Sequence, residues 1–331
     1  MAKMIRRRTA IATAFAAGAL AAPMQSWAKG TYPAEPPNRI VVPFAAGGTA
    51  DCLGRLVAQI LNESMNSAFV IENWSGAGGN LSAEIVAKAR PDGRTLLLGT
   101  VGTAVTNQYV YRNISYDGEL SFAPVALVAE VTNMLVVHPA FPANTFEEFV
   151  DYCKRHGCEE LRYGSPGVGA AGHLTMEYLQ NQAGIRLTHV AYGSRSRMIK
   201  DLLAGNILIA MDNLPTYLRH ARSGAVRALA VSSTERWFAA PDVPSIAEHG
   251  YPDFDSSLWW YIAAPAGTRL ELVKTLSDRI VQGLRSETVV RKIRACGASE
   301  RPGNTEQLAR HIGAERAKWK KVIEAAQLKP Q

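Results

Sequence analysis

The segment RIVVPFAAGGTAD, residues 39–51, runs from a short aliphatic stretch through a glycine pair into a helix-forming region. A second segment of this kind, ENWSGAGGN at residues 72–80, follows the next expected strand. The N–H groups of such a loop and of the first helical turn lack intrahelical acceptors, and together with the helix dipole they favour an anion. A single turn of this kind is as often an ordinary strand–helix connection as an anion site. Two such turns at successive strand ends favour a shared anion site.

The remainder of the chain alternates short β-branched or aliphatic runs with longer amphipathic stretches, which is typical of α/β proteins with mostly parallel sheets. In such sheets a ligand binds outside the carboxyl ends of the strands. Strands are expected at residues 39–44, 68–74, 95–100, 133–139, 161–165, 187–192, 207–213, 226–232 and 258–265. Helices are expected at residues 50–64, 80–89, 146–156, 173–183, 196–204, 269–286 and 305–325.

Length and composition indicate a globular protein of two domains: the chain has 331 residues, of which 47% are hydrophobic and 20% charged. Its four cysteines are too few for a disulfide-built scaffold. Cys153 and Cys158 flank a bend and could form a bridge if their Cα atoms lie within about 7 Å, or they could remain free thiols. Cys52 and Cys296 are interpreted as small core residues.

The N-terminus has the pattern of a signal peptide. Lys3 and three arginines precede the apolar stretch TAIATAFAAGALAA, and Ser26-Trp27-Ala28 suits cleavage before Lys29. Residues 1–28 are therefore expected to be removed and the protein to be periplasmic; whether export uses the general or the twin-arginine route stays open. Removing the four leader charges from the net charge of +7 leaves +3, too mild to indicate a nucleic-acid partner.

Motifs for phosphate, dinucleotide and metal binding are weak or absent. Neither glycine loop is followed by the Lys-Ser/Thr of a phosphate-binding loop. The turn YGSPGVGAAGH, residues 163–173, contains a GxGxxG pattern, but no acidic residue ends the next strand to hold a ribose. His173, Glu177 and His189 could ligate a metal, although capping and packing of a helix is the favoured interpretation. No cofactor and no metal are expected.

Ten motifs in order resemble the Bug family, the periplasmic solute receptors of tripartite tricarboxylate transporters. They cover the chain from about residue 32 to the final helix: VVPFAAGGTAD, VIENWSGAGG, ARPDGRTLLLGT, SYDGELSFAPVALVA, YGSPGVGAAGHLTMEYL, LTHVAYG, MDNLP, VRALAVSSTER, APDVPSIAEHGYPDFD and WWYIAAPAGT. The resemblance implies a two-lobed α/β periplasmic binding protein (type II-like) that closes on a small carboxylate in the cleft between its lobes. Lobe 1 would comprise residues 29–133 and 234–331, and lobe 2 residues 134–233.

The resemblance also implies which residues line that cleft. In lobe 1 the expected ligand-binding residues are Phe44, Ala45, Ala46, Gly47, Gly48, Asp51, Ser75, Gly76, Ala77, Gly78, Gly79 and Thr100. In lobe 2 they are Ser165, Gly167, Val168, Gly169, His173, Tyr192 and Asp212.

Departures from the family pattern concern the ligand. Arg195 and Arg197 stand where the family has small residues after Tyr192, and they either face the cleft and favour a diacid or form a solvated helix start, which is the favoured interpretation. The run Trp259-Trp260-Tyr261 either narrows the cleft or, as favoured, is a core strand.

Two functions remain under consideration. The favoured one is a monomeric, non-enzymatic receptor that binds a di- or tricarboxylate, an amino acid or an aromatic acid. It would deliver the ligand to tripartite tricarboxylate transporter subunits, or signal through a sensor kinase. The alternative is an exported α/β enzyme, a dehydrogenase or a hydrolase, that uses the same cleft with Asp51, His173 or Asp212 as its reactive group.

Overall fold

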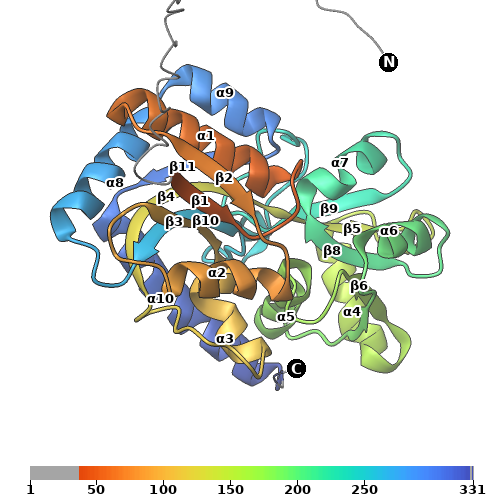
Figure 1. The fold of residues 1–331 in the computed structure, drawn as a ribbon. Coiled ribbons are helices and arrows are strands. Elements are labelled where there is room, and N and C mark those ends of the chain that lie inside the picture. The colour runs from red at the N-terminus through yellow and green to blue at the C-terminus, as the bar shows by residue number, and fades with distance from the viewer. Residues whose placement is uncertain (1–36, 329, 331) are drawn as a thin grey trace, which may run out of the picture. The chain divides into compact units, whose positions relative to one another are not determined.

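Two β-sheets with helices on their faces organise the protein (Figure 1). The computed structural model describes residues 37–328 and residue 330, apart from the side chains of residues 158 and 159, so the predicted signal peptide lies outside the described residues. Sheet A has the strand order β11-β4-β10-β3-β1-β2, and sheet B has the order β7-β6-β8-β5-β9. The strands are β1 Asn38–Val42, β2 Phe69–Asn73, β3 Thr95–Thr100, β4 Phe122–Val131, β5 Asn133–Val137, β6 Arg162–Ser165, β7 Thr188–Ala191, β8 Ile209–Asn213, β9 Arg227–Val231, β10 Leu258–Pro265 and β11 Ser299–Gly303.

The helices connect these strands and cover their faces. In Figure 1, α1, α8 and α9 lie on one face of sheet A, and α2 and α10 lie on the other. The helices are α1 Thr49–Met65, α2 Asn80–Ala87, α3 Asn107–Val110, α4 Phe146–Glu160, α5 Ala171–Ala183, α6 Arg195–Leu203, α7 Leu214–Arg222, α8 Leu270–Leu284, α9 Glu287–Ala295 and α10 Thr305–Ala325, with short turns η1 Ala77–Gly79, η2 Gly102–Thr106 and η3 Ile246–His249.

The sheets are mixed, whereas the sequence predicted mostly parallel ones. In sheet A only β1–β2 and β1–β3 pair in parallel, and in sheet B only β6–β7 and β6–β8 do. The reason is the route of the chain between the sheets. It leaves sheet A after Val131 and enters sheet B at Asn133, at the edge where β6 and β8 end. A strand that enters at this edge must run against its neighbours, and β10 re-enters sheet A in the same way.

The core lies on both faces of sheet A and continues toward sheet B. β3 is buried along its whole length, as expected for a central strand covered on both faces. Trp259, Trp260 and Tyr261 are 1–3% exposed, which confirms that this run is a core strand. Trp259 and Trp319 both donate their indole N–H to Oε2 of buried Glu315. Among the described residues, no helix is both long enough and apolar enough to cross a membrane.

Several elements were missed or misplaced by sequence reasoning. The long strand β4 lies in a segment whose proline and turn residues hide its pattern, and α7 begins with Leu214-Pro215 directly at the end of β8. The helix predicted for 269–286 ends at Leu284, and α9 follows it after a break at Ser286. β11 is a short edge strand with the sequence SERPG, which carries no strand signal.

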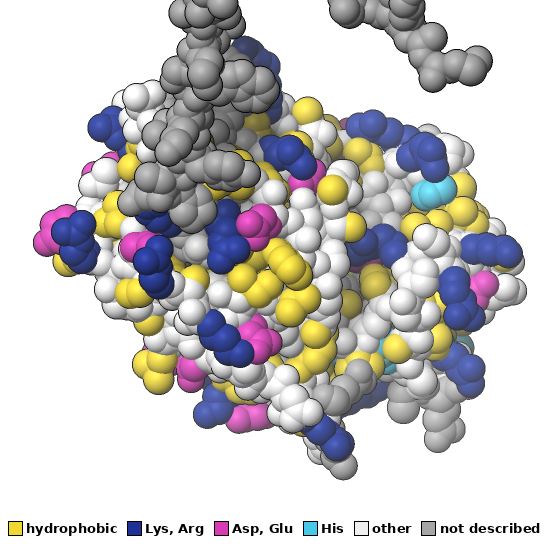
Figure 2. Space-filling view, viewed as in Figure 1, with side chains coloured by type: hydrophobic (Ala, Val, Ile, Leu, Met, Phe, Trp, Pro, Cys, Tyr) yellow, Lys and Arg dark blue, Asp and Glu magenta, His cyan; other side chains and the backbone are white. Residues whose placement is uncertain are grey.

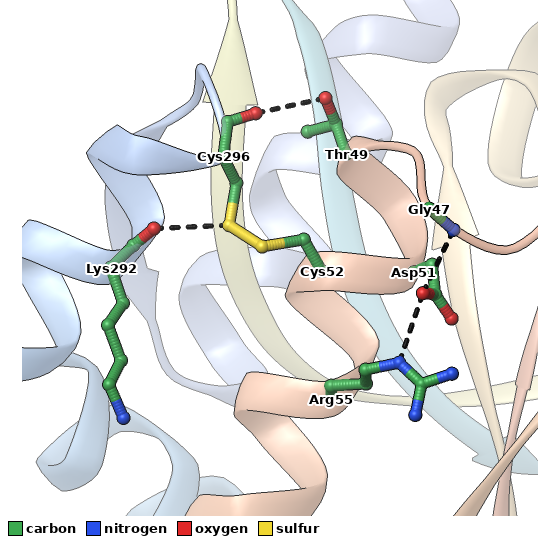
Figure 3. Close-up of a disulfide and its surroundings, with 7 residues drawn as sticks. All are labelled: Gly47, Thr49, Asp51, Cys52, Arg55, Lys292 and Cys296. Carbon is green, nitrogen blue, oxygen red and sulfur yellow. Dashed lines mark hydrogen bonds and ion pairs between the residues drawn. A yellow bond between two sulfur atoms is a disulfide. The ribbon is translucent and has the colours of Figure 1, made fainter.

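A disulfide joins Cys52 to Cys296, which corrects their interpretation as separate core residues. Their Cα atoms are 6.2 Å apart, because α9 packs against the first turns of α1. Thr49 Oγ1 donates to the Cys296 carbonyl oxygen at 3.0 Å and reinforces the same junction (Figure 3). The suggested bridge from Cys153 to Cys158 is wrong, since Cys153 is a free, buried thiol. Burial raises the pKa of Cys153 to about 12, so the thiol stays protonated and unreactive.

Candidate functional site

The two glycine loops of sheet A lie side by side. β1 and β2 pair in parallel with Val42 opposite Asn73, so both strands end at the same edge and each opens into a loop. Two hydrogen bonds tie the loops together: the Trp74 amide donates to the Val42 carbonyl at 2.9 Å, and Asn73 Nδ2 donates to the Phe44 carbonyl at 3.1 Å. The predicted pairing of these loops in one site is therefore geometrically possible.

Backbone conformation explains why the second loop is rich in glycine. Gly78 and Gly79 have φ angles of 63° and 96°, in the left-handed region that disfavours side chains. A Cβ on Gly79 would also lie 3.0 Å from a carbon of Pro43 and 3.1 Å from one of Thr103. The loop thus packs closely on its neighbours, and α2 starts at Asn80 with no side-chain cap on its N–H groups.

Asp51 stabilises the first glycine loop. The Gly47 amide donates to Asp51 Oδ2 at 3.1 Å, and Arg55 Nε donates to the same oxygen at 3.0 Å (Figure 3). The hydrogen bond from Arg55 holds the pKa of Asp51 below its usual value. Asp51 is thus an ionised, buried group that accepts a hydrogen bond from one amide of the loop. The N-cap of α1 is Gly48, so no side chain at this position caps the first N–H groups of the helix.

Exposed apolar side chains stand beside these loops. Phe44 is 41% exposed, Trp74 44% and Leu81 38%. Phe44 was among the predicted site residues, but Trp74 and Leu81 were not, because exposure of a large apolar side chain is not visible in sequence. Thr100, by contrast, is only 3% exposed, and its amide donates to Thr103 Oγ1 within the turn after β3.

In sheet B, Ser165 and two histidines shape the third glycine turn. Ser165 Oγ lies 2.6 Å from His189 Nε2 and donates to the Gly167 carbonyl. The Gly169 amide donates to His173 Nδ1 at 3.0 Å, which leaves the His173 proton on Nε2. The two imidazole rings stack at 3.9 Å. Ser165 and His173 are 0% and 1% exposed. Both side chains are buried and stabilise the turn through their hydrogen bonds to Gly167 and Gly169.

The metal interpretation of His173, Glu177 and His189 finds no support. Glu177 Oε1 accepts hydrogen bonds from Tyr163 Oη at 2.6 Å and from Gln180 Nε2 at 2.9 Å. Within the described part of the chain, no group of three or more His, Cys, Asp or Glu side chains is arranged to hold a metal ion. These residues pack α5 onto sheet B.

The stacked histidines predict a pH-dependent stability. Burial lowers the pKa of His173 to about 3 and that of His189 to about 4. Below the unfolded value near 6.5 the unfolded chain therefore binds more protons than the folded one, and stability is lost as the pH falls from about 6.5 toward 4. Each ring accounts for up to ~1.4 kcal/mol per pH unit in that window.

Urea unfolding at pH 7.5 and pH 5 measures this effect. The variant His189→Gln removes one titrating ring and should have a shallower decline than the wild type. An identical decline in both proteins would contradict the assignment of the pH dependence to this pair.

Asp212 and Arg195 form an ion pair at the end of β8. Arg195 donates from Nε to Asp212 Oδ2 and from Nη2 to Oδ1, the latter at 3.2 Å. The Asp212 side chain is 1% exposed and that of Arg195 49%. Both arginines are exposed in the first turn of α6, as the interpretation of a solvated helix start expects, but Arg195 in addition pairs with the buried Asp212. Tyr192 follows β7 and packs its ring on Gly164.

The carboxyl edges of the two sheets meet where the chain crosses between them. Val131 pairs with Leu258 at this edge of sheet A, and Asn133 pairs with Asn213 at this edge of sheet B. The crossing is buried and polar: Asn133 Nδ2 donates to Thr175 Oγ1 and to the Ser256 carbonyl. Figure 2 shows a groove between the two halves, with basic side chains exposed in it.

A cavity of about 500 Å³ lies elsewhere, between α7, β9 and the segment 239–243. It is lined by none of the predicted site residues. The two arginines that line it form hydrogen bonds with the backbone: Arg222 donates to the Ala239 carbonyl and Arg227 to the Ala143 carbonyl.

Comparison with known proteins agrees with this architecture. Residues 53–328 match the family model of the tripartite tricarboxylate transporter family receptor, TctC. The chain is 32% identical to protein BugT of Bordetella pertussis over 97% of both chains. A protein of R. palustris solved with adipate superposes with a TM-score of 0.76 and 36% identity, over 91% of this chain and 100% of that one. MatC from Rhodopseudomonas palustris, solved with bound malate, has a TM-score of 0.70 and 29% identity, over 87% and 98%.

The resemblance seen in the motifs is confirmed, as is the two-lobed fold of periplasmic binding proteins. The chain belongs to the receptor family of the tripartite tricarboxylate transporters.

Proposed function

We propose that this receptor binds a small organic carboxylate between the carboxyl edges of sheets A and B and delivers it to the membrane subunits of a tripartite tricarboxylate transporter. The observation that carries the proposal is the pair of adjoining glycine loops. Both open helices, α1 and α2, whose first N–H groups have no side-chain cap. Such groups bind carboxylates well. The two relatives with adipate and malate support the same ligand class.

The helix dipoles alone do not provide enough free energy for tight binding of a carboxylate. Micromolar affinity corresponds to about −8 kcal/mol. A carboxylate at a helix N-terminus gains about 0.3–2 kcal/mol per helix. Hydrogen bonds from both halves and closure around the ligand must therefore contribute the remainder. The division into lobe 1, residues 29–133 and 234–331, and lobe 2, residues 134–233, remains part of this proposal, as do the individual site residues.

We further propose that the protein is periplasmic, monomeric and without catalytic activity. The predicted leader supports export, and the disulfide between Cys52 and Cys296 fits an oxidising compartment. Each of the three candidate reactive groups named from the sequence has a structural partner. Asp51 is bound to Gly47 and Arg55, His173 to Gly169, and Asp212 to Arg195.

Ligand-dependent stabilisation tests the receptor function. At a carboxylate concentration of 100 times Kd the free energy of unfolding rises by about 2.7 kcal/mol, and the melting temperature by roughly 5–10 °C. Thermal unfolding with adipate, malate and their monocarboxylate analogues measures this rise, and small-angle scattering detects compaction. If no acid of the panel produces either effect, the proposed function is wrong. Turnover of a bound acid would instead support the enzyme alternative.

A glycine variant tests the site itself. Gly79→Ala places a Cβ against Pro43 and Thr103 and forces both loops apart, so we expect carboxylate affinity to fall at least tenfold. The control is Gly313→Ala in α10, where nothing lies within 4 Å of the added Cβ. Urea unfolding of each ligand-free variant separates lost affinity from lost stability. Unchanged affinity in Gly79→Ala would place the ligand elsewhere.

A further inference from the structure

Arg195 is held at the ligand edge of sheet B by a buried carboxylate. It is the first residue of α6, and its partner Asp212 lies one residue before the end of β8. Asp212 pairs with Met134 across the sheet, directly after the point where the chain crosses from sheet A. Arg195 is therefore on the side of sheet B where the chain passes to sheet A, and the glycine loops of sheet A follow strands that end at the corresponding edge of their sheet.

The ion pair uses only part of the hydrogen-bonding capacity of Arg195. A guanidinium has five N–H donors in one plane. Asp212 accepts one from Nε and one from Nη2, and both N–H groups of Nη1 and one of Nη2 have no partner among the residues that the structure describes. The Asp212 side chain is almost fully enclosed, whereas half of the Arg195 side chain remains accessible. The buried carboxylate thus fixes the plane of a guanidinium that keeps a large accessible surface.

We propose that Arg195 binds a second carboxylate of the ligand and makes this receptor selective for dicarboxylates. The inference rests on the proposed function and adds the ligand class to it. One carboxylate would lie at the glycine loops of sheet A and the other at the free N–H groups of Arg195, so that the ligand joins the two halves. A guanidinium already oriented by Asp212 loses little freedom on binding and matches the planar geometry of a carboxylate.

The charges around Arg195 allow an anion to approach. Arg197 and Lys200 on the same helix are exposed and positive. Burial raises the pKa of Tyr192, and a hydrogen bond with Asp201, near the other end of α6, contributes to the same shift. In the first turn of α6 there is no acidic residue.

Paired ligands test the inference. Calorimetric titration at pH 7 compares adipate with hexanoate, which has the same carbon chain but one carboxylate. The wild type should bind adipate about 10- to 100-fold more tightly, and Arg195→Gln should abolish most of that preference while hexanoate affinity changes less than threefold. Arg195→Lys keeps the charge without the planar fork and should retain part of the preference. Arg197→Gln, two residues along the same helix, is the control and should bind like the wild type.

The outcomes distinguish this inference from the receptor function. If Arg195→Gln lowers the affinity for adipate and for hexanoate equally, or changes neither affinity, Arg195 only stabilises the structure and the inference is overturned. If wild type binds neither acid nor any other carboxylate of the panel, the receptor proposal fails and this inference with it. Because Arg195→Gln leaves Asp212 buried without its partner, the double variant Arg195→Gln/Asp212→Asn serves as a second test. It should regain stability in urea and still lack the preference for adipate.

Discussion

Removing the disulfide between Cys52 and Cys296 is expected to lower the free energy of unfolding by about 2–5 kcal/mol. The bridge closes a loop of 244 residues, and the entropy that such a closure removes from the unfolded chain grows with the length of the loop. The bond also joins α9 to the first turn of α1, next to the Gly47 loop that Asp51 holds (Figure 3). Its loss should therefore loosen one side of the proposed ligand site.

The measurement is urea unfolding of the wild type and of Cys52→Ser/Cys296→Ser. A loss of this size corresponds to a decrease in melting temperature of roughly 5–15 °C for a chain of this length. Reductant should destabilise the wild type by a similar amount and leave the double variant unchanged, which controls for effects on the buried thiol of Cys153. A wild type that is indifferent to reductant in mild urea would contradict the prediction.

Gly172→Ala should cost about 3 kcal/mol or more, because α5 and β8 are in direct backbone contact at this position. A Cβ on Gly172 would lie 1.8 Å from the Met211 carbonyl oxygen and 3.1 Å from the Asp212 Cα. Backbone atoms of a sheet strand cannot move aside as a flexible side chain would, so the helix must shift. The glycine that gave the sequence its GxGxxG pattern thus serves helix–strand packing.

Chemical denaturation of Gly172→Ala against Gly313→Ala measures this cost. Both variants add one methyl group to a helical glycine, but Gly313 is exposed in α10 and has open space around it. Gly313→Ala should stabilise the protein by ~0.5–1 kcal/mol through reduced freedom of the unfolded chain. Since the added Cβ would also meet the backbone of Asp212, this variant should in addition weaken binding of adipate. Equal stability of the two variants would show that α5 adjusts without cost.

The adjoining glycine loops of the candidate site were predictable because their parts are local. A strand that ends in a glycine turn and opens a helix is visible in residues 39–51 and 72–80, and parallel pairing of two successive strands brings such turns together. The hydrogen bond from the Gly47 amide to Asp51, four residues later, was seen only in the structure. The leader and the order of motifs required no tertiary information.

Strand direction and some elements could not be predicted, because they depend on the path of the chain. Nothing within residues 122–131 or 258–265 indicates that these strands carry the chain to and from a second sheet, yet that route makes both sheets mixed. Similarly, the exposure of Trp74 beside the loops depends on what the neighbouring elements leave uncovered.

Local periodicity and turn chemistry were therefore sufficient for the α/β class, the adjoining glycine loops and the family, since each depends on residues close together in the chain. Packing alone decided that Cys52 meets Cys296, 244 residues away, and that Arg195 meets Asp212, 17 residues away. Contacts of this kind form only when helices settle on a sheet at a particular distance and angle. Side-chain volumes throughout the core set that geometry, and no single segment encodes it.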